Sequence, residues 1–239
     1  MKSMPTSSNG RRKVPDKGKV SIIIRTYNSG KFVRDAIESA LRQDISSSLY
    51  EILVVDDGST DNTREILKSY GNKIKVIEQA HKGNVNAANR GIAVASGGYI
   101  ILLDADDTFE PTIISEMINI LESESEVSFV YCDYYQKDMG TGAIKVIALR
   151  DNIFNSVAEG IAFRKTVLEE VGMYDESLIF PEYDLLIKII KEYKGRHIPK
   201  PLFTYVRHKG SITSNKKLAR KGREQIYKKH KMNLSIRDY

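Results

Sequence analysis

Short apolar runs rich in β-branched residues alternate with longer amphipathic segments through the first half of the chain. The apolar runs predict strands because each is bounded by turn residues, and they span residues 20–25, 51–55, 74–78 and 99–103. The segments between them repeat apolar residues at helical spacing and predict helices over residues 31–43, 61–70 and 81–95. Such alternation predicts a largely parallel sheet with helices on both faces.

The regular alternation ends in the second half. A helix from Pro111 to Glu122 leads into apolar strands over residues 127–135 and 143–149. Further helices are predicted over residues 162–171, 182–192 and 216–231, with an extended segment over 196–206 that Pro199 and Pro201 interrupt. No internal repeat or low-complexity tract separates the two halves, so we expect a single α/β domain.

Length and composition fit one hydrophobic core, since the chain has 239 residues, 41% of them hydrophobic. Residues 1–18 are polar and basic and predict a disordered leader, residues 19–213 form the domain, and residues 214–239 form a basic helix or tail.

No apolar stretch approaches the roughly 18 residues that span a bilayer, so we expect a cytoplasmic protein. The one cysteine, Cys132, lies in an apolar strand, which predicts a packed thiol.

Charge is distributed unevenly along the chain. The overall +6 comprises a net +5 in the first 19 residues and +8 in residues 209–231, which leaves −7 on residues 20–208. An acidic body with basic ends argues against a nucleic-acid-binding domain, in which cations and aromatic side chains would line a folded face. The basic C-terminal segment could contact anionic lipid at the inner face of the membrane, or be a solvated helix.

Three carboxylates follow the fully apolar run at 99–103 within four residues: Asp104, Asp106 and Asp107. Like charges crowded at the end of a buried strand require a cation, and Mg²⁺ or Mn²⁺ prefers oxygen ligands of this kind. A metal there can bridge two phosphates and stabilise a departing diphosphate. The alternative is an acidic loop that caps the following helix.

Polar residues also follow the first two predicted strands. Asp56 and Asp57 begin a Gly-Ser turn in which one carboxylate is suited to a base or ribose and the other to organising the turn. Thr26, Tyr27 and Asn28 offer hydroxyl and amide groups, with Tyr27 able to stack on the base. Arg25 is placed to meet phosphate or to pair with an acidic neighbour. Ligands in such sheets bind beyond the carboxyl ends of strands, so these loops should share one crevice.

These strand-end segments, in this order, resemble a family 2 glycosyltransferase. The similarity is carried by VSIIIRTYN from Val20, ILVVDDGSTDNT from Ile52, and the stretch from Gly83 through NRGIA to LDADD ending at Asp107. It covers residues 19–125 closely and residues 126–213 more loosely. The resemblance implies the GT-A fold, a Rossmann-like nucleotide-binding arrangement, with a donor-binding first half and an acceptor-binding second half.

The resemblance also implies roles in the first half. In such enzymes the second Asp of the Asp-Asp-Gly-Ser turn, here Asp57, contacts the base, and the Asp-x-Asp region contacts ribose and metal. Many members read Ala-Arg-Asn before Gly where this chain has Ala-Ala-Asn, so a diphosphate contact must come from Arg25, Lys82 or Arg90 instead. The predicted donor-nucleotide residues are Arg25, Thr26, Tyr27, Asn28, Asp57, Lys82, Asn89, Asp104, Ala105 and Asp106.

The segment from Pro181 to Lys188 resembles the family's helix start that bears the catalytic base. Glu182 is the first candidate and Asp184 the second, because inversion by direct displacement requires a carboxylate that takes the acceptor's proton; the alternative is an acid that stabilises a helix N-terminus. The segment around His208 resembles the closing segment, in which a His completes the metal site. The predicted metal ligands are Asp106, Asp107 and His208, binding Mg²⁺ or Mn²⁺.

Together these features predict inverting transfer of a sugar from a nucleoside diphosphate donor to a hydroxyl of a saccharide or lipid-linked cell-envelope acceptor. The segment around Tyr27 favours a uridine or deoxythymidine diphosphate donor. Two enzyme or binding alternatives remain: a nucleotidyltransferase, which begins with a Gly-rich basic loop that residues 25–30 lack, and a sugar-nucleotide-binding protein without turnover. A phosphoacceptor receiver module would be about half this length.

Overall fold

The computed structural model describes residues 16–150, 152–156, 159–208 and 216–231. The strands are β1 (Asp16–Thr26), β2 (Tyr50–Asp56), β3 (Lys75–Glu78), β4 (Gly97–Asp104), β5 (Thr108–Phe109), β6 (Val127–Asp138), β7 (Ile144–Ile147), β8 (Ile161–Arg164) and β9 (Lys194–Arg207). The α-helices are α1 (Val33–Leu41), α2 (Thr63–Ser69), α3 (Asn84–Val94), α4 (Ile113–Ser123), α5 (Lys165–Glu170), α6 (Pro181–Glu192) and α7 (Lys216–His230). Three 3₁₀ turns lie at Ser47–Leu49, Gly71–Lys73 and Ile153–Asn155.

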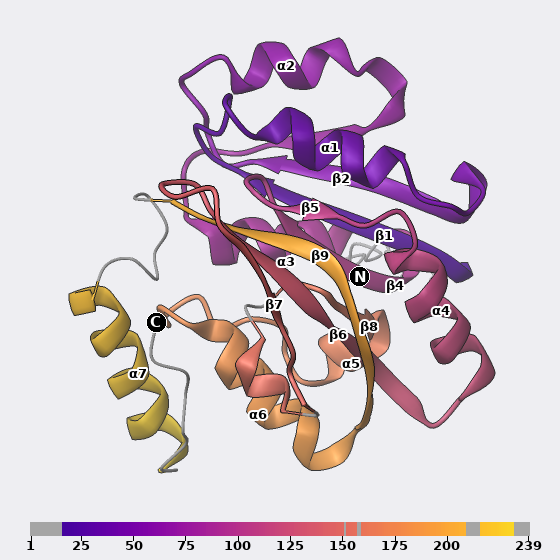
Figure 1. The fold of residues 1–239 in the computed structure, drawn as a ribbon, viewed down its shortest axis with the longest axis vertical. Coiled ribbons are helices and arrows are strands. Elements are labelled where there is room, and N and C mark those ends of the chain that lie inside the picture. The colour runs from indigo at the N-terminus through magenta and orange to yellow at the C-terminus, as the bar shows by residue number, and fades with distance from the viewer. Residues whose placement is uncertain (1–15, 151, 157–158, 209–215, 232–239) are drawn as a thin grey trace, which may run out of the picture.

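The described strands form one mixed sheet in the order β3-β2-β1-β4-β8-β6-β9-β5, with β7 paired to β6. The first four strands are parallel, as predicted, and antiparallel pairing enters with β8, which lies between β4 and β6. Figure 1 shows α1 and α2 on one face of the β1–β2 part of the sheet and α3 on the other. Crossovers between parallel strands are right-handed as a rule. Because the chain moves from β1 to β2 to β3 and then returns to β4 on the other side of β1, α3 lies on the face opposite to α1 and α2.

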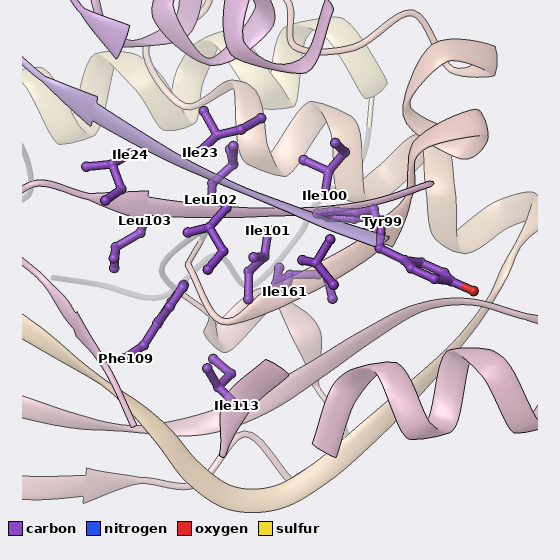
Figure 2. Close-up of a cluster of buried hydrophobic side chains, with 14 of the residues drawn as sticks. Ile23, Ile24, Tyr99, Ile100, Ile101, Leu102, Leu103, Phe109, Ile113 and Ile161 are labelled. Atoms are coloured by element: carbon purple, nitrogen blue, oxygen red, sulfur yellow. The ribbon is translucent and has the colours of Figure 1, made fainter. Parts of the chain in front are cut away.

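The core lies around β1 and β4, whose side chains are buried from Val20 to Thr26 and from Tyr99 to Leu103. Ile101 and Leu103 of β4 point to the same side as Phe109 and Ile113, as Figure 2 shows. Burial on both faces explains why the sequence of β4 is continuously apolar rather than alternating.

The helix α3 packs closely on the strands that carry the site. A Cβ at Gly91 would overlap the side chain of Ile23 and lie 3.3 Å from Val55. The glycine therefore lets α3 approach β1 and β2, which fixes the position of the loop that precedes α3.

Two predictions of local structure need correction. Residues 162–164 are not helical: they belong to β8, which pairs with β4 and β6, and the helix α5 begins only at Lys165. Ile161, Ala162 and Phe163 are buried between two strands, so tertiary burial outweighs the helical spacing of the sequence. β1 begins at Asp16, earlier than the boundary at residue 19, while the rest of the predicted leader lies outside the described residues.

The strand β5 was not predicted, although it places part of the site. Thr108 and Phe109 pair with Thr204 and Phe203 of β9. This short pairing ties the loop that follows β4 to the second half of the chain.

The prolines predicted to interrupt residues 196–206 do not end the strand. In β9, Ile198 pairs with Cys132 and Pro201 with Asp133, so Pro199 and Lys200 form a bulge in the register with β6. A bulge accommodates residues whose backbone cannot complete the hydrogen-bond ladder.

A second, smaller apolar cluster joins α6 to α7. It consists of Phe180, Tyr183, Ile187, Ala219 and Ile226. None of the helices within the described residues combines the length and the apolar character needed to cross a bilayer.

Candidate active site

The three predicted loops meet at one edge of the sheet. Thr26 at the end of β1 pairs with Asp56 of β2, and Arg25 pairs with Asp104 of β4. The backbone amide of Asp57 also donates to the carbonyl of Thr26 at 2.9 Å. Parallel pairing in register therefore brings the ends of β1, β2 and β4 together, as the sequence predicted.

Asp57 is buried and accepts hydrogen bonds from one short segment of the chain. Its Oδ1 accepts from Gln79 Nε2 at 2.7 Å and from the amide of Lys82 at 2.8 Å. Its Oδ2 accepts from the amide of Gly83 at 2.8 Å and lies 2.8 Å from His81 Nδ1. Burial alone would raise the pKa of Asp57, but these hydrogen bonds lower it, so the group is a carboxylate at neutral pH.

Asp56 and Asn28 organise the surrounding turns. Asp56 accepts from the amide of Ser59 at 3.0 Å and pairs with Arg64, as expected for the carboxylate that holds the turn. The Oδ1 of Asn28 accepts from the amide of Thr60 at 2.7 Å. Asn28 has a positive φ of 49°, a conformation that Asn adopts more readily than most residues.

Tyr27 is partly exposed at this edge of the sheet, and Thr26 has a hydroxyl that no described residue uses. The side chain of Tyr27 is 44% exposed. The hydroxyl of Thr26 is buried and has no hydrogen-bond partner among the described residues. Both observations are compatible with the predicted nucleoside contacts.

Arg25 contacts an acidic cluster formed by Asp104, Asp107 and Glu159. Its Nη2 atom lies 2.6 Å from Asp104 Oδ1 and 2.7 Å from Glu159 Oε1. Burial alone would lower the pKa of Arg25, but the two carboxylates raise it well above its ordinary value. The predicted alternative of pairing with acidic neighbours therefore describes Arg25 in this structure.

Asp107 is a further carboxylate of this cluster and is completely buried. Its Oδ1 accepts from the amide of Val206 at 2.8 Å, while its Oδ2 is buried with no hydrogen-bond partner among the described residues. Burial raises the pKa of Asp107 well above its usual value, and the negative charge of the neighbouring Asp106 acts in the same direction. An orphaned buried carboxylate oxygen costs free energy unless a proton or cation satisfies it.

Oxygen atoms of Asp104, Asp107 and Glu159 lie within 4.8 Å of one another, a grouping in the described part of the chain that could hold a divalent ion. The donor set fits Mg²⁺ or Mn²⁺, because it is all carboxylate and includes the orphaned oxygen of Asp107. The predicted ligands are arranged differently. Asp107 belongs to the cluster, whereas Asp106 and His208 bind each other, with 2.8 Å between Asp106 Oδ2 and His208 Nε2.

Glu182 lies in the first turn of α6 and is half-buried. Burial raises its pKa to about 7, with the charge of Asp104 acting in the same direction and that of Arg25 against it. Tyr174 belongs to the same environment, since Glu182 and Glu159 both help to raise its pKa after burial. The first candidate base is thus electrostatically linked to the donor-side cluster.

Asp184 has a different environment from Glu182. It is completely buried and lies 2.8 Å from Lys188, 2.8 Å from Lys229 and 2.7 Å from His230. Burial alone would raise the pKa of Asp184, but the hydrogen bonds of Lys188, Lys229 and His230 lower it. The second candidate base therefore joins α6 to α7, and its contacts match those of a structural ion pair.

The remaining predicted residues lie on the α3 side. The backbone of Lys82 donates to Asp57, and its side chain is exposed. The side chain of Asn89 binds the backbone of Tyr174. Its Nδ2 donates to the carbonyl of Tyr174 at 2.9 Å, and its Oδ1 accepts from the amide of the same residue at 3.1 Å. Ala105 is buried beside the acidic cluster.

Comparison with known families identifies the chain. Residues 21–172, more than half of it, match the model of glycosyl transferase family 2. The chain belongs to glycosyltransferase family 2. This confirms the resemblance seen in the sequence and places the strand-end loops described above within the family's domain.

Two relatives show how much of this family 2 chain is shared. An uncharacterized glycosyltransferase of Rickettsia prowazekii is 34% identical over 188 residues, covering 72% of this chain and 58% of its own length. The chain therefore spans little more than half of that relative. The Escherichia coli enzyme WfaP, described as a UDP-Glc:α-D-GlcNAc-diphosphoundecaprenol β-1,3-glucosyltransferase, is 34% identical over 217 residues, covering 82% of this chain and 80% of WfaP.

Solved structures confirm the predicted GT-A fold. The mannosyltransferase PcManGT of Pyrobaculum calidifontis, in complex with GDP-Man and Mn²⁺, matches with a TM-score of 0.72 at 18% identity, over 94% of this chain and 68% of its own. Staphylococcus aureus TarS 1–349 in complex with UDP matches with a TM-score of 0.68 at 19% identity, over 92% of this chain and 67% of its own.

Two residues of this candidate site were not predicted from the sequence. Glu159 lies two residues before the start of the apolar run of β8, and an acid in that position was the available signal. His81 precedes α3 and stacks on Tyr27, with ring centroids 4.0 Å apart and an interplanar angle of 23°. No motif in the sequence connects those two rings, because their meeting depends on the loops of β1 and β3.

Proposed function

We propose that the protein transfers a sugar, with inversion, from a uridine or deoxythymidine diphosphate donor to a hydroxyl of a lipid-linked saccharide. The environment of Glu182 is the observation that carries this proposal. A half-buried carboxyl with a pKa of about 7 exchanges a proton readily near neutral pH, which is the property required of a general base. Its charge interacts with Arg25 and Asp104, which lie at the ends of the strands that carry the expected nucleoside groups.

The proposed reaction assigns proton transfer to Glu182 and donor binding to the strand-end loops. Glu182 takes the proton from the acceptor hydroxyl as that oxygen attacks the anomeric carbon. The bond from that carbon to the donor's diphosphate breaks, and the diphosphate leaves with the electron pair from the opposite face. Tyr27 and Asp57 hold the nucleoside, so that the reacting atoms are aligned before the proton moves.

The acidic cluster would hold the metal ion. Asp104, Asp107 and Glu159 supply the oxygens, and a bound Mg²⁺ or Mn²⁺ neutralises negative charge on the leaving diphosphate. Arg25 offsets only part of the cluster's charge, because it faces Asp104 and Glu159 at once. Asp106 and His208 would act beside this group, either as further ligands or as the pair that joins the acidic loop to the end of β9.

Relatives support the choice of substrates. The printed name of WfaP specifies a UDP-linked sugar and a diphosphoundecaprenol-linked acceptor, and its match covers most of both chains. The TarS and PcManGT structures were solved with UDP and with GDP-Man. We therefore propose a role in cell-envelope saccharide synthesis, with the protein in the cytoplasm or at the inner face of the membrane.

Replacement of Glu182 tests the proposal. The Glu182→Gln protein should bind UDP as tightly as the unmodified protein but transfer sugar at least about a hundredfold more slowly, because the amide cannot accept the proton. Glu192→Gln, at the exposed far end of α6, is the matched control and should retain full activity. Unimpaired transfer by Glu182→Gln would exclude Glu182 as the base.

A further inference from the structure

The side chain of His81 occupies both groups that the donor's base is expected to use. Its ring stacks on Tyr27 at 4.0 Å, and its Nδ1 lies 2.8 Å from Asp57 Oδ2. A nucleobase bound as proposed would need one face of Tyr27 and one acceptor position on Asp57. The imidazole presents the same two features, a flat ring and a ring nitrogen that can carry hydrogen.

His81 is the partner of Asp57 that can leave most easily. Two of the other three donors are the backbone amides of Lys82 and Gly83, and the third is the side chain of Gln79, which is 9% exposed. These three hold the turn before α3 in place. The side chain of His81 is 54% exposed, so rotation about its own bonds takes it into solvent without moving the backbone.

The backbone beneath His81 is held close to the turn after β2. Gly58 has a φ of +82°, and a Cβ at this position would lie 2.9 Å from the amide nitrogen of His81. The glycine permits the close approach that brings the imidazole over Tyr27. The turn therefore fixes the backbone of His81, from which the imidazole reaches Tyr27.

A carboxylate oxygen has a limited number of acceptor positions. Oδ1 of Asp57 accepts from two donors, and Oδ2 accepts from the amide of Gly83 and faces His81 Nδ1, which donates when that nitrogen carries hydrogen; together these account for about four lone-pair positions of a carboxylate. A base that donates to Asp57 must replace one of the four donors. Movement of His81 frees a position on Oδ2 and a face of Tyr27 at the same time.

We infer that His81 acts as an internal stand-in for the nucleobase: it fills the base position and must rotate out before donor binds, so that it lowers donor affinity. This inference rests on the proposed function, since it assumes that Tyr27 and Asp57 hold the base. Affinity for the donor then depends on the fraction of molecules in which His81 is displaced. A base with a ring N–H, such as uracil or thymine, replaces the lost hydrogen bond to Asp57, whereas cytosine presents an acceptor there.

Calorimetric titration of the whole chain with UDP in the presence of Mn²⁺ tests the inference. His81→Ala should bind UDP about three to ten times more tightly than the unmodified protein, because the competing side chain is gone. His81→Phe keeps a ring on Tyr27 but frees Asp57, so its gain should be smaller. Inorganic pyrophosphate is the control ligand, and its affinity should not change, because the effect lies at the base.

The outcomes separate this inference from the proposed function. UDP affinity that is equal or weaker in His81→Ala, with UDP still bound by the unmodified protein, would overturn the role of His81 alone. A gain that appears equally with pyrophosphate would also overturn it, since the change would then lie at the diphosphate. Failure of UDP, dTDP and GDP to bind either folded protein would overturn the proposed function and this inference together.

Discussion

Arg25 Nη2 lies 2.7 Å from Glu159 Oε1, although 134 residues separate them in the chain. Both side chains are buried, and the same guanidinium nitrogen also contacts Asp104. This contact links the predicted donor-binding half to the predicted acceptor-binding half. It also places a permanent positive charge among carboxylates that would otherwise repel one another.

Replacement of Arg25 should therefore destabilise the fold as well as the site. We expect Arg25→Ala to lower the free energy of unfolding by about 3–5 kcal/mol, because removal of one partner leaves buried carboxylates uncompensated. Urea denaturation followed by circular dichroism measures this change. Arg90→Ala, an exposed arginine on α3, is the control and should shift stability by no more than about 0.5 kcal/mol. Equal effects of the two variants would contradict the role given to Arg25.

The pH dependence of transfer should report the ionisation of Glu182. Because burial raises the pKa of Glu182 to about 7, the carboxylate that accepts a proton is lost as pH falls through that value. With substrates saturating, kcat should rise through pH 7 to a plateau and be about tenfold below the plateau one pH unit under the pKa. A profile that is flat between pH 5.5 and 8.5, where chemistry limits turnover, would contradict this assignment.

Divalent cations should stabilise the protein through Asp107. At a hundredfold excess over the dissociation constant, Mn²⁺ should add about 2.7 kcal/mol to the free energy of unfolding, which thermal denaturation detects without any activity assay. Asp107→Asn should lose this response because the orphaned buried oxygen is no longer charged. Asp35→Asn, an exposed acid on α1, should keep it. A full response in Asp107→Asn would remove this residue from the proposed metal site.

Asp184 should prove structural. Removal of its carboxylate leaves Lys188, Lys229 and His230 without their shared partner, so Asp184→Ala should lower the free energy of unfolding by about 3 kcal/mol. The pKa of Asp184 is lowered in the folded state, so its stabilising contribution is complete above the ordinary pKa of Asp and is lost as pH falls below it. Well below its own melting temperature, the variant should still transfer sugar. Loss of transfer in the folded variant would restore Asp184 as the base.

The exposed face of α7 should bind anionic lipid. Its exposed cations include Lys217, Arg220, Lys221 and Lys228. Each cation near an anionic surface contributes about 1 kcal/mol, so co-sedimentation with phosphatidylglycerol vesicles should exceed that with phosphatidylcholine vesicles. The double variant Lys217→Glu, Lys221→Glu should lose this difference, whereas Lys68→Glu with Lys73→Glu, two exposed lysines elsewhere, should retain it. Equal sedimentation with both lipids would leave α7 as a solvated helix.

Local pattern predicted most elements of the first half. The strands β1, β2 and β4 coincide closely with apolar runs, and the loops that follow them share one edge because parallel strands align their carboxyl ends. Residues 162–164 were predicted incorrectly, since a short apolar run fits either element until its neighbours are known. These residues form a strand because they pair with β4 and β6.

The acidic loop after β4 shows which properties follow from the sequence and which require the tertiary structure. The sequence by itself determined the fold class, the family and the presence of three carboxylates at the end of a buried strand, because spacing and hydrophobicity are local properties. Only the tertiary structure decided which partners those carboxylates have: Glu159 beside Asp104 and Arg25, and His208 beside Asp106. The contacts of Arg25 with Glu159 and of Asp106 with His208 join residues more than a hundred positions apart, and the burial and charge that set the pKa values of these groups exist only once the chain has folded.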